Sequence, residues 1–216
     1  MWDWNYTLTF LPDLIKALRI TISATFVAFF VACILGFPLA MARRSRYRIV
    51  SWPASGFIEI IRSTPLLAQV YFVFYVFPDY GISLSPFAAG VLALGVHYAT
   101  YLSEVYRSGI DGIPRGQWEA ARALNFSRTR TWFNIIIPQA IPPILPVMGN
   151  YLIGMFKETP LLSAITLVEI LQTAKITGSQ SFRYLEPITV VGIMFLVLSY
   201  ISSLGVQRLE ARLNRR

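Results

Sequence analysis

Apolar residues run along this chain in stretches too long for the buried face of a soluble helix. Residues 20–42 hold 23 positions without a charge, and residues 187–207 hold another 21. About 20 apolar residues in a helix are enough to cross the hydrocarbon core of a bilayer. Each of these two stretches is therefore predicted to be a transmembrane helix.

Three further apolar stretches are less uniform, at about 50–77, 86–103 and 138–156. The first contains Glu59, Arg62 and Pro65, and the third begins at Pro138 and contains three more prolines, so we expect both to be bent or broken. Together the five stretches predict an all-α integral membrane protein with five transmembrane helices. We expect residues 1–216 to form a single transmembrane domain.

The first span has two neighbouring features. Residues 6–19 place apolar and charged side chains on opposite sides of a helix, which predicts either an interfacial amphipathic helix or an extension of the span. Within the span, small residues recur at every fourth position, which favours close approach of another helix. These residues are Ala24, Ala28, Ala32, Gly36 and Ala40.

The charges set the predicted topology. Only 14% of the residues are charged, and the net charge of +8 lies beside apolar runs, so we exclude a nucleic-acid-binding protein. The predicted inner segments hold thirteen Lys and Arg residues against five in the outer segments. Positively charged loops stay in the cytoplasm, so we expect a multi-pass protein of the bacterial inner membrane, with its N-terminus outside and its C-terminus cytoplasmic. Five spans cannot form two symmetric halves within one chain, so a symmetric transporter needs a second subunit of the same kind, either another copy or a homologous chain.

The longest predicted cytoplasmic loop covers about residues 108–137. Residues 117–124 are strong helix formers, and Asn125 tolerates the left-handed conformation that ends a helix. Ser127 is placed to cap a second helix, which we expect to run to about Ile137. The pattern predicts a helix–turn–helix whose alanines, next to Glu119, form a flat surface for docking into another protein.

This loop also resembles a known motif. Glu119-Ala120-Ala121, then Asn125, then Ile136-Ile137-Pro138 resembles the EAA loop of ABC-importer permeases, with Asn125 in place of the usual Gly and Ile137 in place of Leu. The resemblance implies an ABC type I importer permease fold, in which the loop sits in a cleft of a separate ATPase subunit. From the residues alone, an ordinary alanine-rich cytoplasmic loop is the alternative.

A second candidate site lies inside the membrane, where the tetrapeptide Thr-Pro-Leu-Leu occurs twice, at 64–67 and 159–162. Proline removes a helix hydrogen bond, so we expect both helices to break there and expose their ends to a solute path, which Thr159, Pro160 and Leu161 would help to line. Ionisable residues within spans usually face a pathway or a partner.

The charges beside the two tetrapeptides suit a zwitterionic solute. Glu158 would meet its cationic end, and Arg62 or Lys157 its carboxylate. The alternatives are that Lys157 and Glu158 form a charge pair at the outer surface and that Arg62 pairs with Glu59.

The resemblance extends along most of the chain. Lys157 to Leu162 is similar to the K-[DE]-[ST]-x-L segment of polar amino-acid permeases, and residues 98–105, 114–124 and 208–210 resemble the His/Glu/Gln/Arg-type group. Within that group, residues 155–165 followed by 182–187 most resemble the ectoine and hydroxyectoine permease subunits. The resemblance implies import of such a solute from a solute-binding protein.

The remaining expectations concern chemistry. There is no G-x-x-x-x-G-K-[ST] segment and no catalytic or metal-ligand cluster, so we expect no enzyme activity and no cofactor in this chain, with ATP and Mg at partner ATPase subunits. A secondary transporter or channel driven by an ion gradient is the main rival. We expect His97 to hydrogen-bond a neighbouring helix, and Glu169 to be a candidate contact for a docked binding protein.

Overall fold

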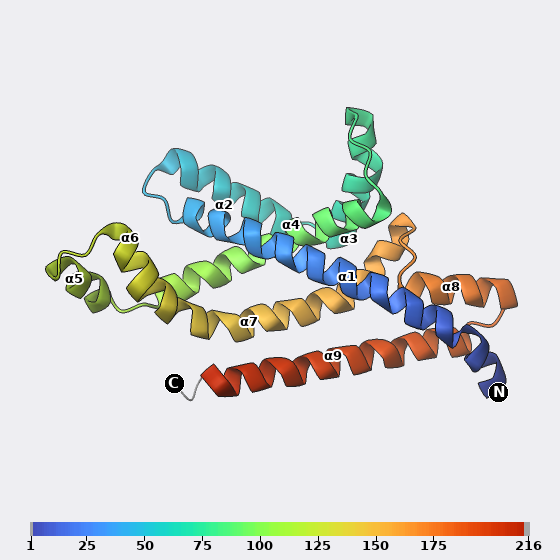
Figure 1. Ribbon diagram of the computed structural model, residues 1–216. Helices are drawn as coiled ribbons and strands as arrows, with labels where there is room; N and C mark the ends of the chain where they lie inside the picture. The colour runs from blue at the N-terminus through green and yellow to red at the C-terminus, as the bar shows by residue number, and fades with distance from the viewer. Residues whose placement is uncertain (1, 214–216) are drawn as a thin grey trace.

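The computed structural model describes residues 2–213, and in these residues every regular element is a helix. The elements form an elongated bundle, with a helical hairpin projecting from one end and a bent segment standing out from its side (Figure 1). In chain order the elements are α1 (Trp4–Arg43), α2 (Arg48–Ser63), α3 (Leu66–Tyr71), η1 (Phe72–Val76), η2 (Phe77–Tyr80), α4 (Pro86–Asp111), α5 (Arg115–Ala123), α6 (Arg128–Thr131), η3 (Trp132–Ile136), α7 (Ile137–Glu158), η4 (Thr159–Ile165), α8 (Ile170–Ser181) and α9 (Leu185–Leu213).

Helix α1 is continuous over 40 residues, so residues 6–19 are an extension of the first span and not a separate amphipathic helix. At 1.5 Å per residue it is about 60 Å long, roughly twice the thickness of the hydrocarbon core. Its small residues pack against α4, as the sequence predicts. A Cβ at Gly36 would lie 3.0 Å from the Ala99 carbonyl oxygen, because the two helix backbones are in contact there.

The structure accounts for up to four of the five predicted membrane spans. Within residues 2–213, three helical runs are long and apolar enough to cross a membrane, Trp4–Arg43, Arg128–Ile165 and Leu185–Leu213. Helix α2 and the segment from α3 to η2 would form a fourth span, bent by 105° at Thr64–Pro65. Helix α4 is enclosed by other helices and carries His97 and several tyrosines and serines, so it reads as less apolar. The fifth span, over 86–103, stays a prediction.

The end of the bundle opposite the hairpin is closed by α8 and the N-terminal residues. Asp3 caps α1 by accepting from the backbone N–H groups of Asn5 and Tyr6, and it pairs with Arg183 at 3.3 Å. The Tyr6 N–H, with Arg183 beside it, lowers the pKa of the Asp3 carboxyl. Arg183 also stacks over the Tyr6 ring and pairs with Glu186, so one side chain ties the start of α1 to the start of α9.

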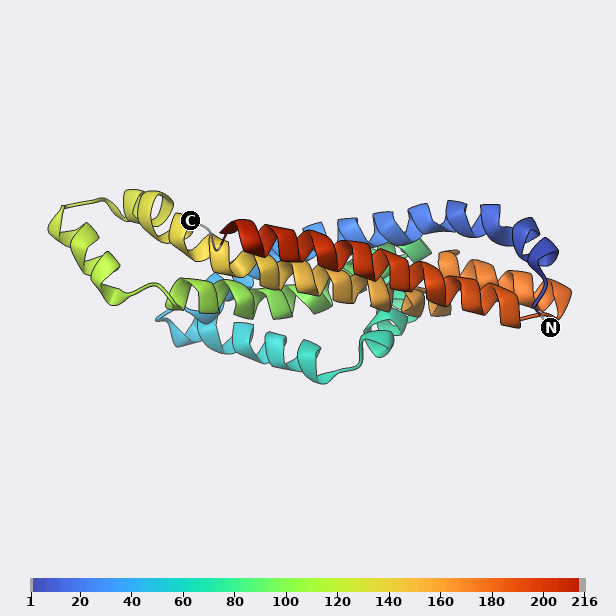
Figure 2. The ribbon, with the colours of Figure 1, turned by 90° about the horizontal axis from the view of Figure 1, so that it is seen from below.

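The two ends of the described chain lie at opposite ends of the bundle. The C-terminal end of α9 lies on the same side as α5 and α6, and the N-terminus lies beside α8, in both views (Figures 1 and 2). Helix α9 packs against α7 but buries little besides Glu186, Pro187 and Val191, so most of its apolar surface faces outward. A long helix with an exposed apolar surface is suited to contact with lipid.

Candidate coupling surface and translocation path

The projecting hairpin begins with α5, whose end is closed by a left-handed residue as the sequence predicts. Asn125 has φ of 53°, its N–H donates to the Arg122 carbonyl, and the Phe126 N–H donates to the Ala121 carbonyl. This pair of bonds is the Schellman arrangement, in which the residue after the cap is left-handed. Asn125 therefore performs the turn for which Gly is the usual residue.

The three residues of the Glu-Ala-Ala motif on α5 differ in their exposure. Glu119 and Ala120 are exposed, whereas Ala121 is fully buried against the second arm of the hairpin. Trp118 and Trp132 brace the two arms, with ring centroids 5.5 Å apart in an edge-on arrangement. The exposed side of α5 thus carries Ala120 beside the Glu119 carboxylate and the Arg122 guanidinium, and the two tryptophans hold the arms of the hairpin together.

The second arm differs from the prediction of a separate helix ending near Ile137. Ser127 does cap it, accepting from the Arg130 N–H, but α6 continues through the π-helical turn η3 directly into α7. Pro138, which is exposed, lies in the first turn of α7 and does not interrupt the run from Arg128 to Ile165. The hairpin is therefore rigidly continuous with a predicted span.

The first Thr-Pro site is a sharp break, as predicted. Helix α2 ends at Ser63, and Thr64 is extended, with φ of −109° and ψ of 142°. The residue before a proline is driven out of the helical region by the proline ring, which explains the position of the break. Arg62 lies just before it, with its guanidinium 4.8 Å from the centre of the Tyr101 ring.

Arg62 is not paired with Glu59, which was the alternative from sequence. Glu59 lies 3.7 Å from Arg43 instead, at the edge of a charge network between α1, α2 and α4. Arg43 also binds Glu104 at 2.5 Å. Because Arg43 takes the carboxylate of Glu59, Arg62 is left on the exposed face of α2, beside Ser63.

The second Thr-Pro site does not break, so that prediction was wrong. Thr159 is helical, with φ of −54° and ψ of −31°, and the chain continues as the 3-10 helix η4. The Thr159 hydroxyl donates to the Phe156 carbonyl at 2.7 Å. Leu162 and Ile165 are fully buried, and their packing in the core holds this segment in a helix despite Pro160.

Three tyrosines join the two sites. Tyr98 and Tyr101 on α4 and Tyr151 on α7 lie with ring centroids 5.7–6.0 Å apart. Arg62 covers Tyr101 at one side of this cluster, and Glu158 lies by Tyr98 at the other, with one carboxylate oxygen buried and without a hydrogen-bond partner in the described residues. The cluster therefore has a guanidinium beside one tyrosine ring and a carboxylate beside another.

The remaining predicted path residues lie around this cluster in different ways. Lys157 is exposed and helps to line a groove between α7 and α9. Thr159 is buried, and Pro160 and Leu161 are half-buried. Sequence reasoning missed the tyrosines as site residues, although Tyr98 and Tyr101 are three apart on one helix face within an apolar run.

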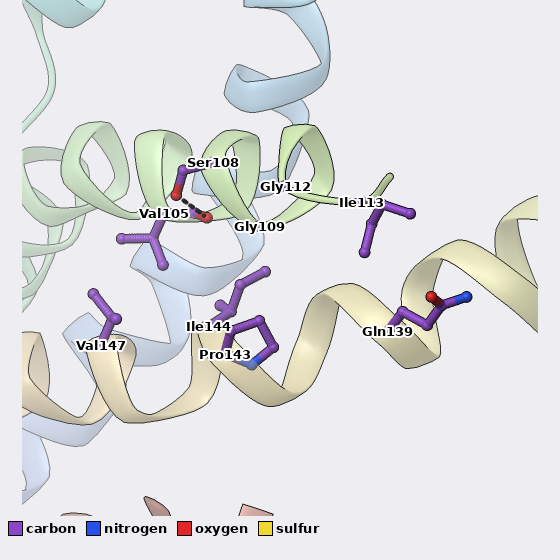
Figure 3. Close-up of a pocket in the computed structure, with 9 residues that line it drawn as sticks. All are labelled: Val105, Ser108, Gly109, Gly112, Ile113, Gln139, Pro143, Ile144 and Val147. Atoms are coloured by element: carbon purple, nitrogen blue, oxygen red, sulfur yellow. Dashed lines mark hydrogen bonds between the residues drawn. The ribbon is translucent and has the colours of Figure 1, made fainter. Parts of the chain in front are cut away.

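Two other places carry no ligand chemistry. A cavity of about 370 Å³ lies between the C-terminal end of α4 and the N-terminal half of α7 (Figure 3), but its walls are mainly apolar, and the Ser108 hydroxyl donates to the Val105 carbonyl of its own helix. Glu169 was expected to be a surface contact for a binding protein, but the structure places it in the interior. It is fully buried, and its carboxylate accepts from the N–H groups of Leu171 and Gln172 to cap α8. Burial raises the pKa of the Glu169 carboxyl.

Helices of membrane-spanning length, a broken helix with charged residues beside the break and a projecting helical hairpin are the features of a permease with the ABC type I fold. A crystal structure of an amino acid ABC transporter with histidines matches this chain with a TM-score of 0.91 and 32% identity, over 98% of this chain and 99% of that one. An inward-facing structure of the MetNI methionine ABC transporter, 19% identical with a TM-score of 0.77, shares the fold.

The sequence comparisons give the family. Residues 13–215 match the family described as binding-protein-dependent transport system inner membrane component. The chain is 46% identical to a probable amino-acid ABC transporter permease protein, y4tG, of Sinorhizobium fredii, over 98% of this chain and 91% of that protein. It is 34% identical to the L-cystine transport system permease protein TcyB of Bacillus subtilis, over 96% and 89%. The chain belongs to this family, and it is a permease subunit of an amino-acid ABC importer and not an enzyme.

Proposed function

We propose that the chain moves ectoine, hydroxyectoine or a similar polar zwitterion from a binding protein to the cytoplasm, beside a second permease subunit. The observation that carries the proposal is the tyrosine cluster with Arg62 on one side and Glu158 on the other. A zwitterion presents one charge of each sign, so the two side chains match its two ends. Lys157, Thr159, Pro160 and Leu161 complete the proposed path.

The exposed face of α2 supports the second subunit. Glu59, Arg62 and Ser63 are exposed there, in a helix predicted to lie within the membrane. Polar side chains in a bilayer are costly unless they face a partner or a water-filled path. A second permease packed across this face would enclose the path between two chains. Energy would come from ATP and Mg at separate ATPase subunits, docked on Glu119, Ala120, Ala121, Asn125 and Pro138.

The solute is tested with the assembled transporter in liposomes, by measuring ATP hydrolysis stimulated by its binding protein. Ectoine and hydroxyectoine are compared with arginine, glutamine and cystine. We expect the first pair to give the largest stimulation. Stimulation by a proteinogenic amino acid alone would reject the ectoine assignment and leave the family assignment in place. Uptake that an ion gradient drives without ATP would instead support the secondary-transporter alternative.

Glu158→Gln tests the intramembrane site. The amide keeps the shape and removes the charge, so a solute with a cationic end loses a charge-assisted hydrogen bond of about 1.5–3 kcal/mol. Uptake at limiting solute should fall by about tenfold or more, with assembly unchanged. Glu210→Gln, an exposed change on α9, is the matched control. Equal uptake in the two variants would remove Glu158 from the path.

Glu119→Lys tests the coupling surface. A reversed charge in a protein interface costs several kcal/mol when it meets a complementary site. Copurification of the ATPase should fall more than about tenfold, while the permease stays in the membrane. Arg212→Glu reverses an exposed charge on α9 and serves as the control. Normal ATPase binding and normal uptake in Glu119→Lys would reject the docking role of α5.

A further inference from the structure

The break at Thr64–Pro65 leaves backbone groups that need partners. The last four carbonyl groups of a helix receive no hydrogen bond from within the helix. Water that could donate to them is scarce at membrane depth. The Thr64 hydroxyl lies 3.0 Å from the Ile60 carbonyl and 3.2 Å from that of Ile61, so it covers part of this need. The Thr64 carbonyl, just beyond the end of α2, needs a donor as well.

Gln69 supplies the missing donors from the other side of the break. Its Nε2 donates to the Ile61 carbonyl at 2.7 Å, and it lies 3.1 Å from the Thr64 carbonyl and 2.8 Å from the Thr64 hydroxyl. The two carbonyls can only accept, so the amide nitrogen must face them. One side chain on α3 therefore bridges back to the end of α2.

His97 fixes the orientation of that amide. Its Nδ1 lies 3.1 Å from the Oε1 of Gln69, and because this oxygen only accepts, Nδ1 carries the hydrogen. His97 is buried on α4, the most enclosed helix of the bundle, and its ring lies 5.2 Å from that of Tyr101. The expectation that His97 bonds a neighbouring helix is confirmed. Its bond connects the break to the same tyrosine that Arg62 covers.

We propose that Gln69 is a positioning residue, which His97 holds in place, and that it sets the angle between α2 and α3 and so places Arg62 over the tyrosine cluster. Without the amide, the Thr64 carbonyl loses its donor and the Ile61 carbonyl keeps only the Thr64 hydroxyl at 3.2 Å, so the end of α2 is free to shift. Arg62 stands one residue from Ile61 and moves with it. The consequence for transport rests on the proposed path, whereas the consequence for the helix angle does not.

The helix angle is followed as a distance between two spin labels, one on each side of the break. The distance is measured by double electron–electron resonance in the assembled transporter in nanodiscs. Trp52→Cys on α2 and Tyr80→Cys on η2 are exposed labelling positions, in a Cys33→Ala background. Gln69→Glu is isosteric but turns an oxygen toward the two carbonyls. We expect a narrow distance distribution in the labelled parent and a broadened or shifted one in Gln69→Glu.

His97 provides the milder variants and the rescue. His97→Phe keeps a ring but removes the donor, and it should broaden the distribution in the same direction. His97→Gln restores a donor, and it should return the distribution toward that of the parent. Gln207→Glu makes the same chemical change at an exposed position of α9 and should change nothing. If His97→Phe and His97→Gln gave the same distance distribution, the hydrogen-bond donor at position 97 would not matter, and the role of His97 would be overturned.

Solute turnover at saturating binding protein is the second readout. Loss of the Gln69 hydrogen bonds in Gln69→Glu should lower turnover about tenfold, with ATP hydrolysis within about twofold of the parent. An unchanged distance distribution in Gln69→Glu overturns the proposal, whatever happens to turnover. A changed distribution with normal turnover overturns the link between the break and Arg62. If the parent moves no polar zwitterion, the proposed function fails while the distances still report on Gln69.

Discussion

Asn125 is the residue on which the shape of the projecting hairpin most depends. Its left-handed backbone allows the Asn125 and Phe126 N–H groups to bond back to α5. Gly adopts this conformation without strain, Asn with little, and a β-branched residue at a cost of about 1–2 kcal/mol. The conformation, more than the side chain, is what the position requires.

Substitutions at Asn125 should follow this order. Asn125→Gly is expected to protect the α5 amides from hydrogen exchange as well as the parent does or better. Asn125→Val should raise their exchange about tenfold and weaken ATPase copurification. Hydrogen exchange with mass spectrometry over residues 115–127 measures this. Equal exchange in the Gly and Val variants would mean that contacts outside the turn hold the loop.

Single residues also show where sequence reasoning works and where it stops. Asn125 and Ser127 act on backbone groups within a few positions, so local patterns predicted their roles. Gln69 and His97 are 28 positions apart, and only the packing of α3 on α4 joins them. A lone polar residue four positions after Pro65 of the Thr-Pro pair is the one sequence feature that could have drawn attention to Gln69.

At the scale of elements, one tetrapeptide gives two outcomes. Thr-Pro-Leu-Leu breaks the chain after α2 but continues as a 3-10 helix after α7. Leu162 and Ile165 are fully buried after the second site, and Leu66 and Val70 are buried in the same core after the first. Local propensity marks both sites as weak points, and tertiary packing decides which of them breaks. The sequence therefore identified the sites but not their geometry.

The contact between α4 and α7 gives an element-scale prediction. A Cβ at Gly109 would lie 2.3 Å from the Cδ1 of Ile144, whose side chain projects toward Gly109 across the cavity edge (Figure 3). Overpacking of this kind costs about 1–3 kcal/mol. Gly109→Ala should therefore lower the melting temperature of the purified transporter, and adding Ile144→Ala should recover part of the loss.

Gly56 is the matched control for Gly109. It is also a helical glycine, but a Cβ there would meet nothing within 4 Å. Gly56→Ala should leave the melting temperature unchanged or raise it slightly, because Ala is the better helix former by about 1 kcal/mol. A similar loss in both variants would point to backbone flexibility and not to the Ile144 contact.

For the whole molecule, the described ends lie at opposite ends of the bundle, with α5 at the C-terminal end. The orientation in the membrane comes from the charge bias and is still a prediction. Trp4→Cys and Leu124→Cys, 71% and 67% exposed, allow a direct test in a Cys33→Ala background. A membrane-impermeant maleimide should label Trp4→Cys in intact spheroplasts and Leu124→Cys only after lysis. The reverse order would invert the topology.

The polar face of α2 also bears on how the cell makes this protein. The Glu59 side chain is 61% exposed, and Arg62, three residues later, is exposed without an acidic partner in residues 2–213. On insertion scales a charged side chain in the bilayer centre costs about 2.5–3.5 kcal/mol. A chain synthesised without its partners would present these groups to lipid and become a substrate for membrane proteolysis. Its abundance should therefore follow the supply of the scarcest partner and not the strength of its own promoter.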